Sequence, residues 1–253
     1  MNIFIPSKNR CDTSQLLMSL YENDFFDITV IVEPQDYNNY ALTYPKFDFL
    51  QLDMDNQGIS YVRNFIKQYT ETNKIDRYWQ LDDDISNFYI RQNTSLIKSD
   101  IEILIQCQKQ FIQQGIALGS LEYRQFAWSA NKQFIYNSFC DTCVYVDNLL
   151  TQGMRYRKFV EGKEDRDFAM QVIQNNLKSA RNTLFAFSCP TNGSNKGGLK
   201  EIFYDLHKEE ECCKNMVELW GYDICQHYIK PDGRNDVKIN WKKIRSKQLP
   251  LFL

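Results

Sequence analysis

The sequence predicts an α/β fold with a mostly parallel sheet flanked by helices. Runs of β-branched and aromatic residues alternate with segments whose apolar residues keep helical spacing, and this alternation favours parallel strands joined by right-handed crossovers. The run 28–32 is wholly apolar, as in a strand buried on both faces. A third observation is the run 78–84, which starts aromatic and ends in aspartates, as a buried strand reaching a ligand-binding edge would.

Four strands and two helices are expected in the first third of the chain. The strands are 3–5, 28–32, 47–52 and 78–84. The first helix is capped by Asp12 or Thr13 and keeps apolar residues at helical spacing. The second helix begins at Gly58. Loops connect the remaining segments.

The rest of the chain continues the alternation less regularly. We expect helices at 99–114, 164–177 and about 199–219, and strands at 116–121, 143–146, 184–189 and 237–241. No internal repeat or low-complexity linker separates these segments. The sequence therefore predicts one domain over 1–245, followed by a tail at 246–253.

Composition excludes several classes of protein. The 253 residues carry a net charge of −2, so any contact with nucleic acid must come from local patches. The segment 1–6 lacks the design of a signal peptide, and no apolar run is long enough for a membrane span. We therefore expect a cytoplasmic protein whose eight cysteines are reduced. Cys140 and Cys143 have metal-like spacing, but no second pair completes a zinc site.

Three consecutive aspartates, Asp82, Asp83 and Asp84, organise the prediction of function. A bare acidic run is equally compatible with a solvated loop. Here the run ends a buried strand, at the sheet edge where open α/β folds bind ligands. Carboxylate oxygens at such an edge suit Mg²⁺ or Mn²⁺, which in turn can bind a diphosphate.

Donor-rich residues are expected beside these aspartates. Ser7, Lys8 and Arg10 follow the first strand, where nucleotide binding is favoured over an ordinary polar turn. Glu33 ends the second strand and could accept hydrogen bonds from a base or ribose. Arg63 and the free N–H groups at the start of its helix could bind phosphate, although Arg63 could equally pair with a surface acid.

Two later segments complete the candidate site. Glu164 and Asp165 lie at a helix start, where the helix dipole alone explains acidic residues, but one of them could be a general base. Lys196, Gly197 and Gly198 could form a mobile lid that closes over phosphate.

Other catalytic classes are disfavoured by what the sequence lacks. It contains no Walker lysine loop, no GxGxxG and no GxSxG motif. Its two histidines, His207 and His227, are too few for a histidine-rich metal enzyme, and His227 is a weak candidate as a metal ligand.

Taken together, these residues resemble those of GT-A glycosyltransferases, a Rossmann-like fold that transfers sugars from nucleotide diphosphates. The resemblance implies that the segment from Pro6 to Arg10 binds the nucleotide and that Glu33 contacts the base. It also implies that Asp82 and Asp84 form the DxD element, which touches the ribose and holds the divalent metal. Asp165 would then be the catalytic base of an inverting enzyme, with Glu164 the alternative.

Over 1–245 the chain is more narrowly similar to the TET/JBP-associated glycosyltransferases. The resemblance is carried by the runs 6–10, 81–85, 164–168 and 196–199. It implies a UDP-sugar donor, Mn²⁺ or Mg²⁺, and hydroxymethylated pyrimidines in DNA as acceptors. The family is found largely in phages, which would place the protein in the cytoplasm of a bacterial host. The sequence lacks a clear histidine for the third metal position.

The tail suggests a second partner. Gln248, Leu249, Leu251 and Phe252 resemble the peptide with which bacterial and phage proteins bind the DNA sliding clamp, although a tail packed on its own domain is the alternative. The segment 230–247 contains seven basic and two acidic residues, a local charge of +5 that could contact a phosphate backbone.

The sequence thus predicts a metal-dependent glycosyltransferase that moves a sugar, glucose from UDP-glucose, to a 5-hydroxymethylpyrimidine in DNA. One alternative is a GT-A enzyme of polysaccharide or lipid-linked glycan synthesis. Others are a nucleotidyltransferase and a DNA- or clamp-binding module that has lost activity. No membrane contact is expected.

Overall fold

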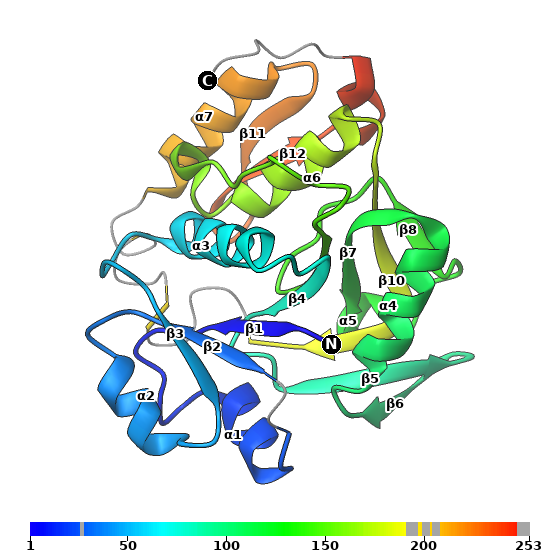
Figure 1. Cartoon of the computed structure of the whole chain (residues 1–253). Helices are drawn as coiled ribbons and strands as arrows, with labels where there is room; N and C mark the ends of the chain where they lie inside the picture. The colour runs from blue at the N-terminus through cyan, green and yellow to red at the C-terminus, as the bar shows by residue number, and fades with distance from the viewer. Residues whose placement is uncertain (26–27, 191–196, 199–202, 204–207, 247–253) are drawn as a thin grey trace.

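A computed structural model describes residues 1–25, 28–190, 197–198, 203 and 208–246 (Figure 1). The strands of the main sheet are β1 (Ile3–Pro6), β2 (Thr29–Val32), β3 (Asp48–Gln51), β4 (Arg77–Leu81), β5 (Asn87–Gln92), β6 (Ser95–Ser99), β7 (Ile116–Tyr123), β8 (Phe134–Tyr136), β9 (Cys143–Asp147) and β10 (Lys178–Ser188). The α-helices are α1 (Gln15–Glu22), α2 (Tyr37–Thr43), α3 (Ile59–Thr72), α4 (Ile103–Gln114), α5 (Arg124–Ala127), α6 (Glu164–Gln174) and α7 (Glu209–Trp220). A separate hairpin pairs β11 (Cys225–Ile229) with β12 (Asn235–Ile239), and two short 3-10 helices span Lys158–Val160 and Trp241–Ser246.

The main sheet is mostly parallel in strand direction, which confirms the predicted fold class. Its order is β3-β2-β1-β4-β9-β7-β10-β5-β6, with β8 paired to β10. The strand pairings give β1, β2, β3, β4, β6, β7 and β10 one direction, while β5, β8 and β9 run the other way. The carboxyl ends of β1, β2, β4, β7 and β10 therefore meet at one edge of the sheet.

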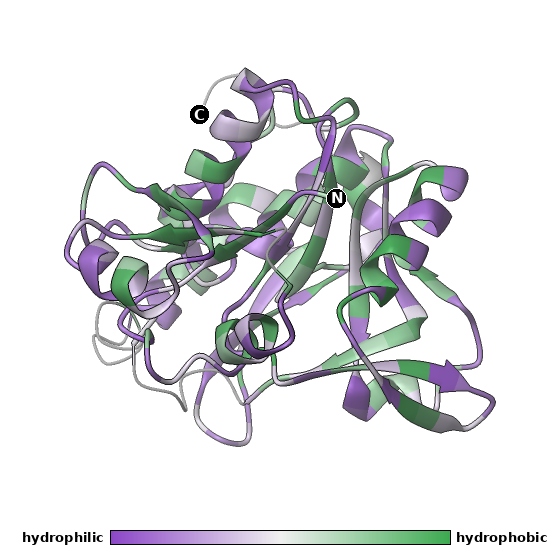
Figure 2. Ribbon diagram, turned by 60° about the horizontal axis from the view of Figure 1, so that its bottom comes forward, coloured by the Kyte–Doolittle hydropathy of each residue, from purple (hydrophilic) through white to green (hydrophobic). Residues whose placement is uncertain are grey.

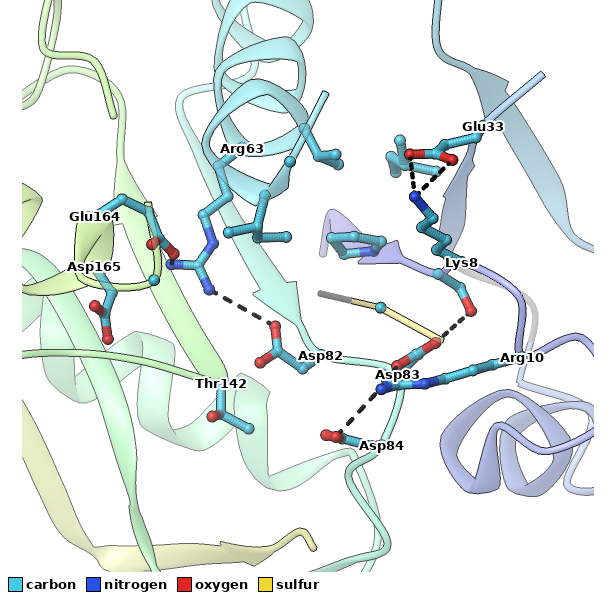
Figure 3. A pocket seen from close by; sticks show the side chains of 18 of the residues that line it. Lys8, Arg10, Glu33, Arg63, Asp82, Asp83, Asp84, Thr142, Glu164 and Asp165 are labelled. Carbon is cyan, nitrogen blue, oxygen red and sulfur yellow. Dashed lines mark hydrogen bonds and ion pairs between the residues drawn. The ribbon is translucent and has the colours of Figure 1, made fainter. Parts of the chain in front are cut away.

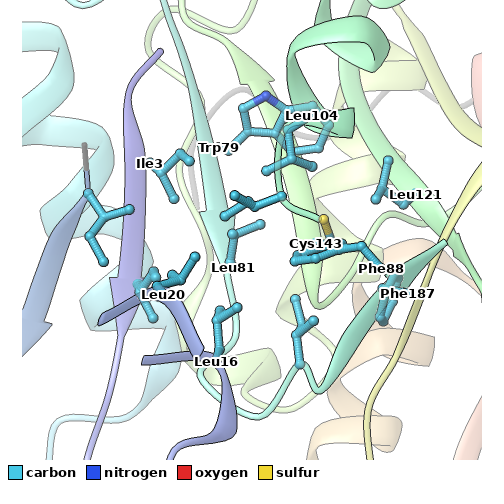
Figure 4. Close-up of a cluster of buried hydrophobic side chains, with 14 of the residues drawn as sticks. Ile3, Leu16, Leu20, Trp79, Leu81, Phe88, Leu104, Leu121, Cys143 and Phe187 are labelled. Atoms are coloured by element: carbon cyan, nitrogen blue, oxygen red, sulfur yellow. The ribbon is translucent and has the colours of Figure 1, made fainter. Parts of the chain in front are cut away.

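Helices cover both faces of the sheet because successive strand residues point to opposite sides. On one face, Ile3 and Ile5 of β1 pack in the cluster that contains the apolar residues of α1 and α4 (Figure 4). On the other face, Phe4 packs in the cluster formed with α3 and α6. Hydrophobic residues accordingly concentrate on the central strands and on the inner faces of the helices (Figure 2).

The C-terminal segment builds a third hydrophobic cluster against α6. Met170 and Ile173 of α6 pack with Trp220 of α7, Cys225 of β11 and Val237 of β12. This cluster holds the α7–β11–β12 unit on the side of α6 that faces away from the sheet (Figure 1). The unit therefore supports the helix whose first turn carries Glu164 and Asp165.

Several expected elements have different bounds in the structure. Ser14, not Asp12 or Thr13, caps α1, and its hydroxyl oxygen accepts from the Leu17 amide at 3.2 Å. The expected strand at 184–189 is the end of β10, which begins at Lys178. Helix α2 and the β5–β6 hairpin were not predicted, and the helix expected from residue 99 begins at Ile103. The expected strand at 237–241 is β12, which pairs in a hairpin.

Two further expectations are affected by the described range. Helix α7 begins at Glu209, and most of the segment 199–207 lies outside the described residues. The clamp-like residues at 248–252 also lie outside them. None of the helices in the described part of the chain is long and apolar enough to cross a membrane.

Asp236 joins the C-terminal hairpin to α6 by buried ion pairs, and this predicts an acid-sensitive stability. Its carboxylate lies 2.5 Å from Arg166 Nη1 and 2.6 Å from Lys230 Nζ. Burial opposes ionisation, but the charges of Arg166 and Lys163 and the bond from Lys230 together lower the pKa of Asp236. A carboxylate with a lowered folded-state pKa contributes stability above its unfolded pKa of about 4, and this stability is lost as the pH falls further.

We therefore expect Asp236→Asn to lower the free energy of unfolding at pH 7 by roughly 3–5 kcal/mol, because it leaves buried cations without their partner. Urea unfolding between about pH 5 and pH 2 should show a smaller loss of stability for the variant than for the wild type. Asp223→Asn, at an exposed position before β11, is the control. Equal acid sensitivity of the wild type and Asp236→Asn would contradict the assignment.

Candidate functional site

A pocket of about 200 Å³ opens at the carboxyl edge of β1, β2 and β4 (Figure 3). The sequence-predicted residues that line it are Pro6, Ser7, Lys8, Arg10, Glu33, Arg63, Asp82, Asp83, Asp84, Glu164, Asp165 and Gly198. Residues far apart in the sequence thus converge, because the parallel strands β1, β2 and β4 end at one edge, where the first turns of α3 and α6 also lie. We call this cavity the edge pocket.

The turn after β1 is fixed to the aspartate run by short hydrogen bonds. Ser7 Oγ donates to Asp83 Oδ2 at 2.5 Å, and Arg10 Nη1 lies 2.5 Å from Asp83 Oδ1. Ser14 Oγ also donates to the Asp83 backbone carbonyl at 2.7 Å. Both carboxylate oxygens of Asp83 are therefore used within the protein, which indicates that this residue shapes the pocket more than it offers oxygens to a ligand.

Glu33 anchors a second network on the β2 side of the edge pocket. Its carboxylate lies 3.1 Å from Lys8 Nζ and accepts from the Asn56 amide at 2.9 Å. Gln35 Nε2 donates to the same carboxylate at 2.6 Å. Ile31 and Leu52 line the pocket nearby, so this end combines an apolar wall with a fixed acid.

The glycine pair of the predicted lid lies against the turn after β1. The Gly198 amide donates to the Lys8 carbonyl at 3.3 Å. Gly197 has φ +75°, and a Cβ there would lie 2.6 Å from the Lys8 carbonyl oxygen. Glycine is needed at this position both for its backbone conformation and for the close approach. Lys196 lies outside the described residues.

Arg63 is the buried cation between the aspartate run and α6. Its Nη1 lies 3.0 Å from Glu164 Oε1 and its Nη2 lies 3.8 Å from Asp82 Oδ1. The guanidinium also lies over the ring of Tyr156, with 5.6 Å to the centroid. Arg63 therefore pairs with site acids, not with the surface acid that the sequence left open.

The N-terminus of α3 does not have the free N–H groups that the sequence suggested. The Glu161 carboxylate accepts from the amides of Ile59 and Ser60. Gly58 has φ +89°, and a Cβ there would lie 2.6 Å from Glu161 Oε1. An acidic side chain thus occupies the helix end that was expected to bind phosphate, because a carboxylate gains from the same dipole.

Among the described residues that line the edge pocket, acidic side chains outnumber basic ones. The acids are Glu33, Asp82, Asp83, Asp84, Asp141, Glu164 and Asp165, and the bases are Lys8, Arg10 and Arg63. Burial raises the pKa of Asp82 to about 7; Arg63 opposes this, and the charges of Asp84 and Asp83 add to it. Burial and the charge of Asp165 raise the pKa of Asp141 to about 7. Burial is the largest cause of both shifts and neighbouring carboxylates add to them, so a cation bound nearby would lower the pKa of both groups.

Glu164 and Asp165 differ in surroundings although they are adjacent. Glu164 is buried against Arg63, and burial raises its pKa to about 8 against the effect of that arginine. Asp165 is only partly buried and points away from Arg63, toward Thr142 (Figure 3). The Arg166 amide donates to Asp165 Oδ1 at 2.8 Å, which fixes the carboxylate beside the pocket. Asp165 is therefore better placed than Glu164 to meet a substrate.

The structure does not bring His227 to the edge pocket. It lies on β11, where Nε2 is 2.7 Å from Asn235 Oδ1 on the paired strand. Among the described residues no group of three or more His, Cys, Asp or Glu side chains is arranged to hold a metal ion. Of the residues that the sequence predicted as metal ligands, Asp82 and Asp84 line the edge pocket.

Two polar residues of the edge pocket were missed by sequence reasoning. Asp141 and Thr142 line the edge pocket, and the Thr142 carbonyl accepts from the Asp82 amide at 2.8 Å. They lie between Cys140 and Cys143, whose spacing drew attention to metal binding instead. The useful signal was the polar pair at the start of β9, which is antiparallel to β4 and so begins where β4 ends.

Comparison with known proteins gives one sequence family and several similar folds. The model of the family of TET-associated glycosyltransferases matches residues 1–197. No curated protein matches the chain significantly in sequence.

Three solved structures resemble the chain at low identity. A197 from STIV has 14% identity and a TM-score of 0.46, covering 76% of this chain and 85% of that one. A protein described as a nucleotide-diphospho-sugar transferase from Desulfovibrio desulfuricans has 11% identity and a TM-score of 0.40, with 71% and 78% covered. Mannose-1-phosphate geranyltransferase from Thermus thermophilus has 6% identity and a TM-score of 0.43, with 74% and 75% covered.

The buried pair of Arg63 and Glu164 yields a stability prediction. Arg63→Met should lower the free energy of unfolding by roughly 3–5 kcal/mol above about pH 8, where Glu164 is ionised and would be left buried without its counter-charge, and by less at pH 7. The double variant Arg63→Met/Glu164→Gln should recover part of this loss in urea unfolding. Arg234→Met, which removes an exposed pair with Asp232, should change stability by about 1 kcal/mol or less. If Arg63→Met costs no more than this control, the pair does not stabilise the site.

Proposed function

The chain belongs to the family of TET-associated glycosyltransferases, and from this premise we propose that it moves glucose from UDP-glucose to a 5-hydroxymethylpyrimidine in DNA. The observation that carries the proposal is the edge pocket. It combines an apolar wall, basic side chains and unbalanced carboxylates at the carboxyl ends of parallel strands.

The donor is the substrate that this pocket supports best. The apolar wall of Ile31 and Leu52 beside Glu33 suits a nucleobase, which has flat faces and a polar edge. Lys8 and Arg10 line the same cavity and supply positive charge for a diphosphate. Gly197 and Gly198 of the proposed lid lie against the turn that carries these two residues.

A divalent cation, Mn²⁺ or Mg²⁺, fits the donor set. Asp82 and Asp84 line the edge pocket and offer hard carboxylate oxygens. Two protein ligands suffice for Mg²⁺ when substrate phosphates and water complete its coordination. When bound, such an ion stabilises the negative charge of the leaving diphosphate.

Asp165 is the proposed general base. Its carboxylate would take the proton from the acceptor hydroxyl while that oxygen forms a bond to the anomeric carbon of the sugar. The bond from this carbon to the diphosphate oxygen breaks with its electron pair, so UDP leaves and the configuration inverts. Arg63 holds Glu164 away from this proton transfer by pairing with it.

The DNA acceptor is supported by the family and by local charge. Lys238, Lys242 and Lys243 are exposed near the end of the described chain and suit a phosphate backbone. The proposed clamp contact through Gln248, Leu249, Leu251 and Phe252 rests on sequence alone.

A transfer assay tests the reaction. Purified protein, Mn²⁺ and UDP-glucose are incubated with DNA that contains 5-hydroxymethylcytosine or 5-hydroxymethyluracil. Mass spectrometry of the nucleosides should show a hexose added to the modified base only. Asp165→Asn should lower kcat by roughly 10²–10⁴-fold with little change in the KM for UDP-glucose. Hydrolysis of UDP-glucose without any transfer to DNA would keep the donor and refute the acceptor.

A second variant tests the metal assignment. Asp84→Asn should abolish stimulation of transfer by added Mn²⁺ and weaken Mn²⁺ binding measured by electron paramagnetic resonance. Asp100→Asn, at an exposed position before α4, is the matched control. Unchanged Mn²⁺ binding and unchanged turnover in Asp84→Asn would exclude this residue as a ligand.

A further inference from the structure

A second hollow, of about 540 Å³, lies at the carboxyl ends of β7 and β10. Its walls include Tyr123 at the end of β7, Arg124 and Trp128 of the α5 segment, and Phe187 and Cys189 around the end of β10. Because β7 and β10 run in the same direction as β4, this hollow opens at the same sheet edge as the edge pocket. We call it the aromatic hollow.

The aromatic hollow adjoins the edge pocket. The Tyr123 hydroxyl lies 3.1 Å from Thr142 Oγ1, and Thr142 lines the edge pocket. Burial raises the pKa of Cys189 to about 12, with the charges of Asp84 and Asp82 adding to the shift, so this residue lies within electrostatic range of the aspartates. A molecule in the hollow would therefore be next to the place where the donor sugar is expected.

The tryptophan that lines the hollow is exposed. Trp128 has an exposed fraction of 56%, although tryptophan is on average a largely buried residue. Trp128 Nε1 donates to the Gln125 carbonyl at 3.0 Å, so its polar atom is satisfied within its own turn. Tyr123 is held by the buried Phe187, with 4.6 Å between ring centroids. These rings form a preorganised surface for a flat ligand.

The positive charge beside these rings indicates which kind of flat ligand the hollow would bind. Arg124 is exposed, and its guanidinium lies over the ring of Tyr89, 5.0 Å from the centroid. Among the described residues no carboxylate lies within ion-pair distance of Arg124. An exposed cation next to exposed aromatic faces is the combination that binds single-stranded nucleic acid, because bases stack on the rings while the cation meets a phosphate.

We propose that the aromatic hollow is the acceptor subsite and binds one unpaired nucleobase stacked on Trp128 and Tyr123, with the neighbouring phosphate on Arg124. The base must be unpaired to bind in this way. Inside a duplex both of its faces are covered by neighbouring base pairs and cannot stack on a protein ring. The identification of the base as the hydroxymethylpyrimidine acceptor rests on the proposed function. Because Tyr123 of the hollow contacts Thr142 of the edge pocket, a base held in the hollow would lie beside the cavity that Asp165 lines.

The test measures binding and turnover with a 5-hydroxymethylcytosine oligonucleotide, single-stranded or in a duplex. Fluorescence anisotropy should show tighter binding of the single strand. Trp128→Ala should raise its Kd, and the KM for DNA in transfer, by roughly ten- to a hundredfold, while the KM for UDP-glucose stays near the wild-type value. Trp128→Phe should restore most of the affinity because it keeps a stacking face. Arg124→Ala should reduce the slope of log Kd against log salt by about 0.7.

Tyr222→Ala is the matched control, since Tyr222 is 69% exposed in the turn between α7 and β11, outside the hollow. If the wild type binds and modifies DNA and Trp128→Ala behaves like this control, the hollow is not the acceptor subsite, while the proposed function stands. If the wild type turns over UDP-glucose but neither binds nor modifies DNA, both proposals fail. If the hollow instead binds a protein partner, Trp128→Ala should bind and modify DNA as well as Tyr222→Ala does.

Discussion

The edge pocket depends on the way Asp83 joins the end of β4 to the turn after β1. Its carboxylate is bonded to Ser7 and Arg10, and its carbonyl accepts from Ser14, the cap of α1. Parallel strands are joined by backbone hydrogen bonds along their length. These bonds stop where the strands end, so other contacts must hold the loops that follow in place. Asp83, the central residue of the aspartate run, makes these contacts, and Asp82 and Asp84 on either side of it line the pocket.

Charge balance is the second constraint on the site. In the described structure Arg63 pairs with Glu164 and Asp82, and Arg10 pairs with Asp84, but two of these contacts are long, at 3.8 and 3.7 Å. Neighbouring buried carboxylates disfavour one another's ionised form, which favours binding of a cation together with its anionic ligand. This is the physical reason for assigning donor binding, and not structural support alone, to the aspartate run.

The two hollows divide the same sheet edge between them. The edge pocket lies over the parallel β1, β2 and β4, whereas the aromatic hollow lies over β7 and β10. Strand β9 runs antiparallel between β4 and β7, so the residues just before it, Asp141 and Thr142, enter the edge at the boundary. Because β9 is antiparallel, its amino end lies at the edge where the parallel strands have their carboxyl ends. The polar side chains just before β9 are thereby brought to the site. The unit formed by α7, β11 and β12 supports the site indirectly, because it packs on α6, the helix that carries Glu164 and Asp165.

The sequence by itself determined the fold class, the positions along the chain of the strands that carry the site, and most of the polar pocket residues. This was possible because the end of a strand can be recognised from a local sequence pattern, and the carboxyl ends of parallel strands lie together at the ligand-binding edge of the sheet. Only the tertiary structure decided that Glu161, and not a phosphate, meets the amides at the start of α3, and that His227 lies away from the aspartates. It alone also brought Asp141, Thr142 and the exposed Trp128 to the same edge. These placements depend on contacts between residues that are distant in the chain, for which neither periodicity nor local spacing leaves a signal.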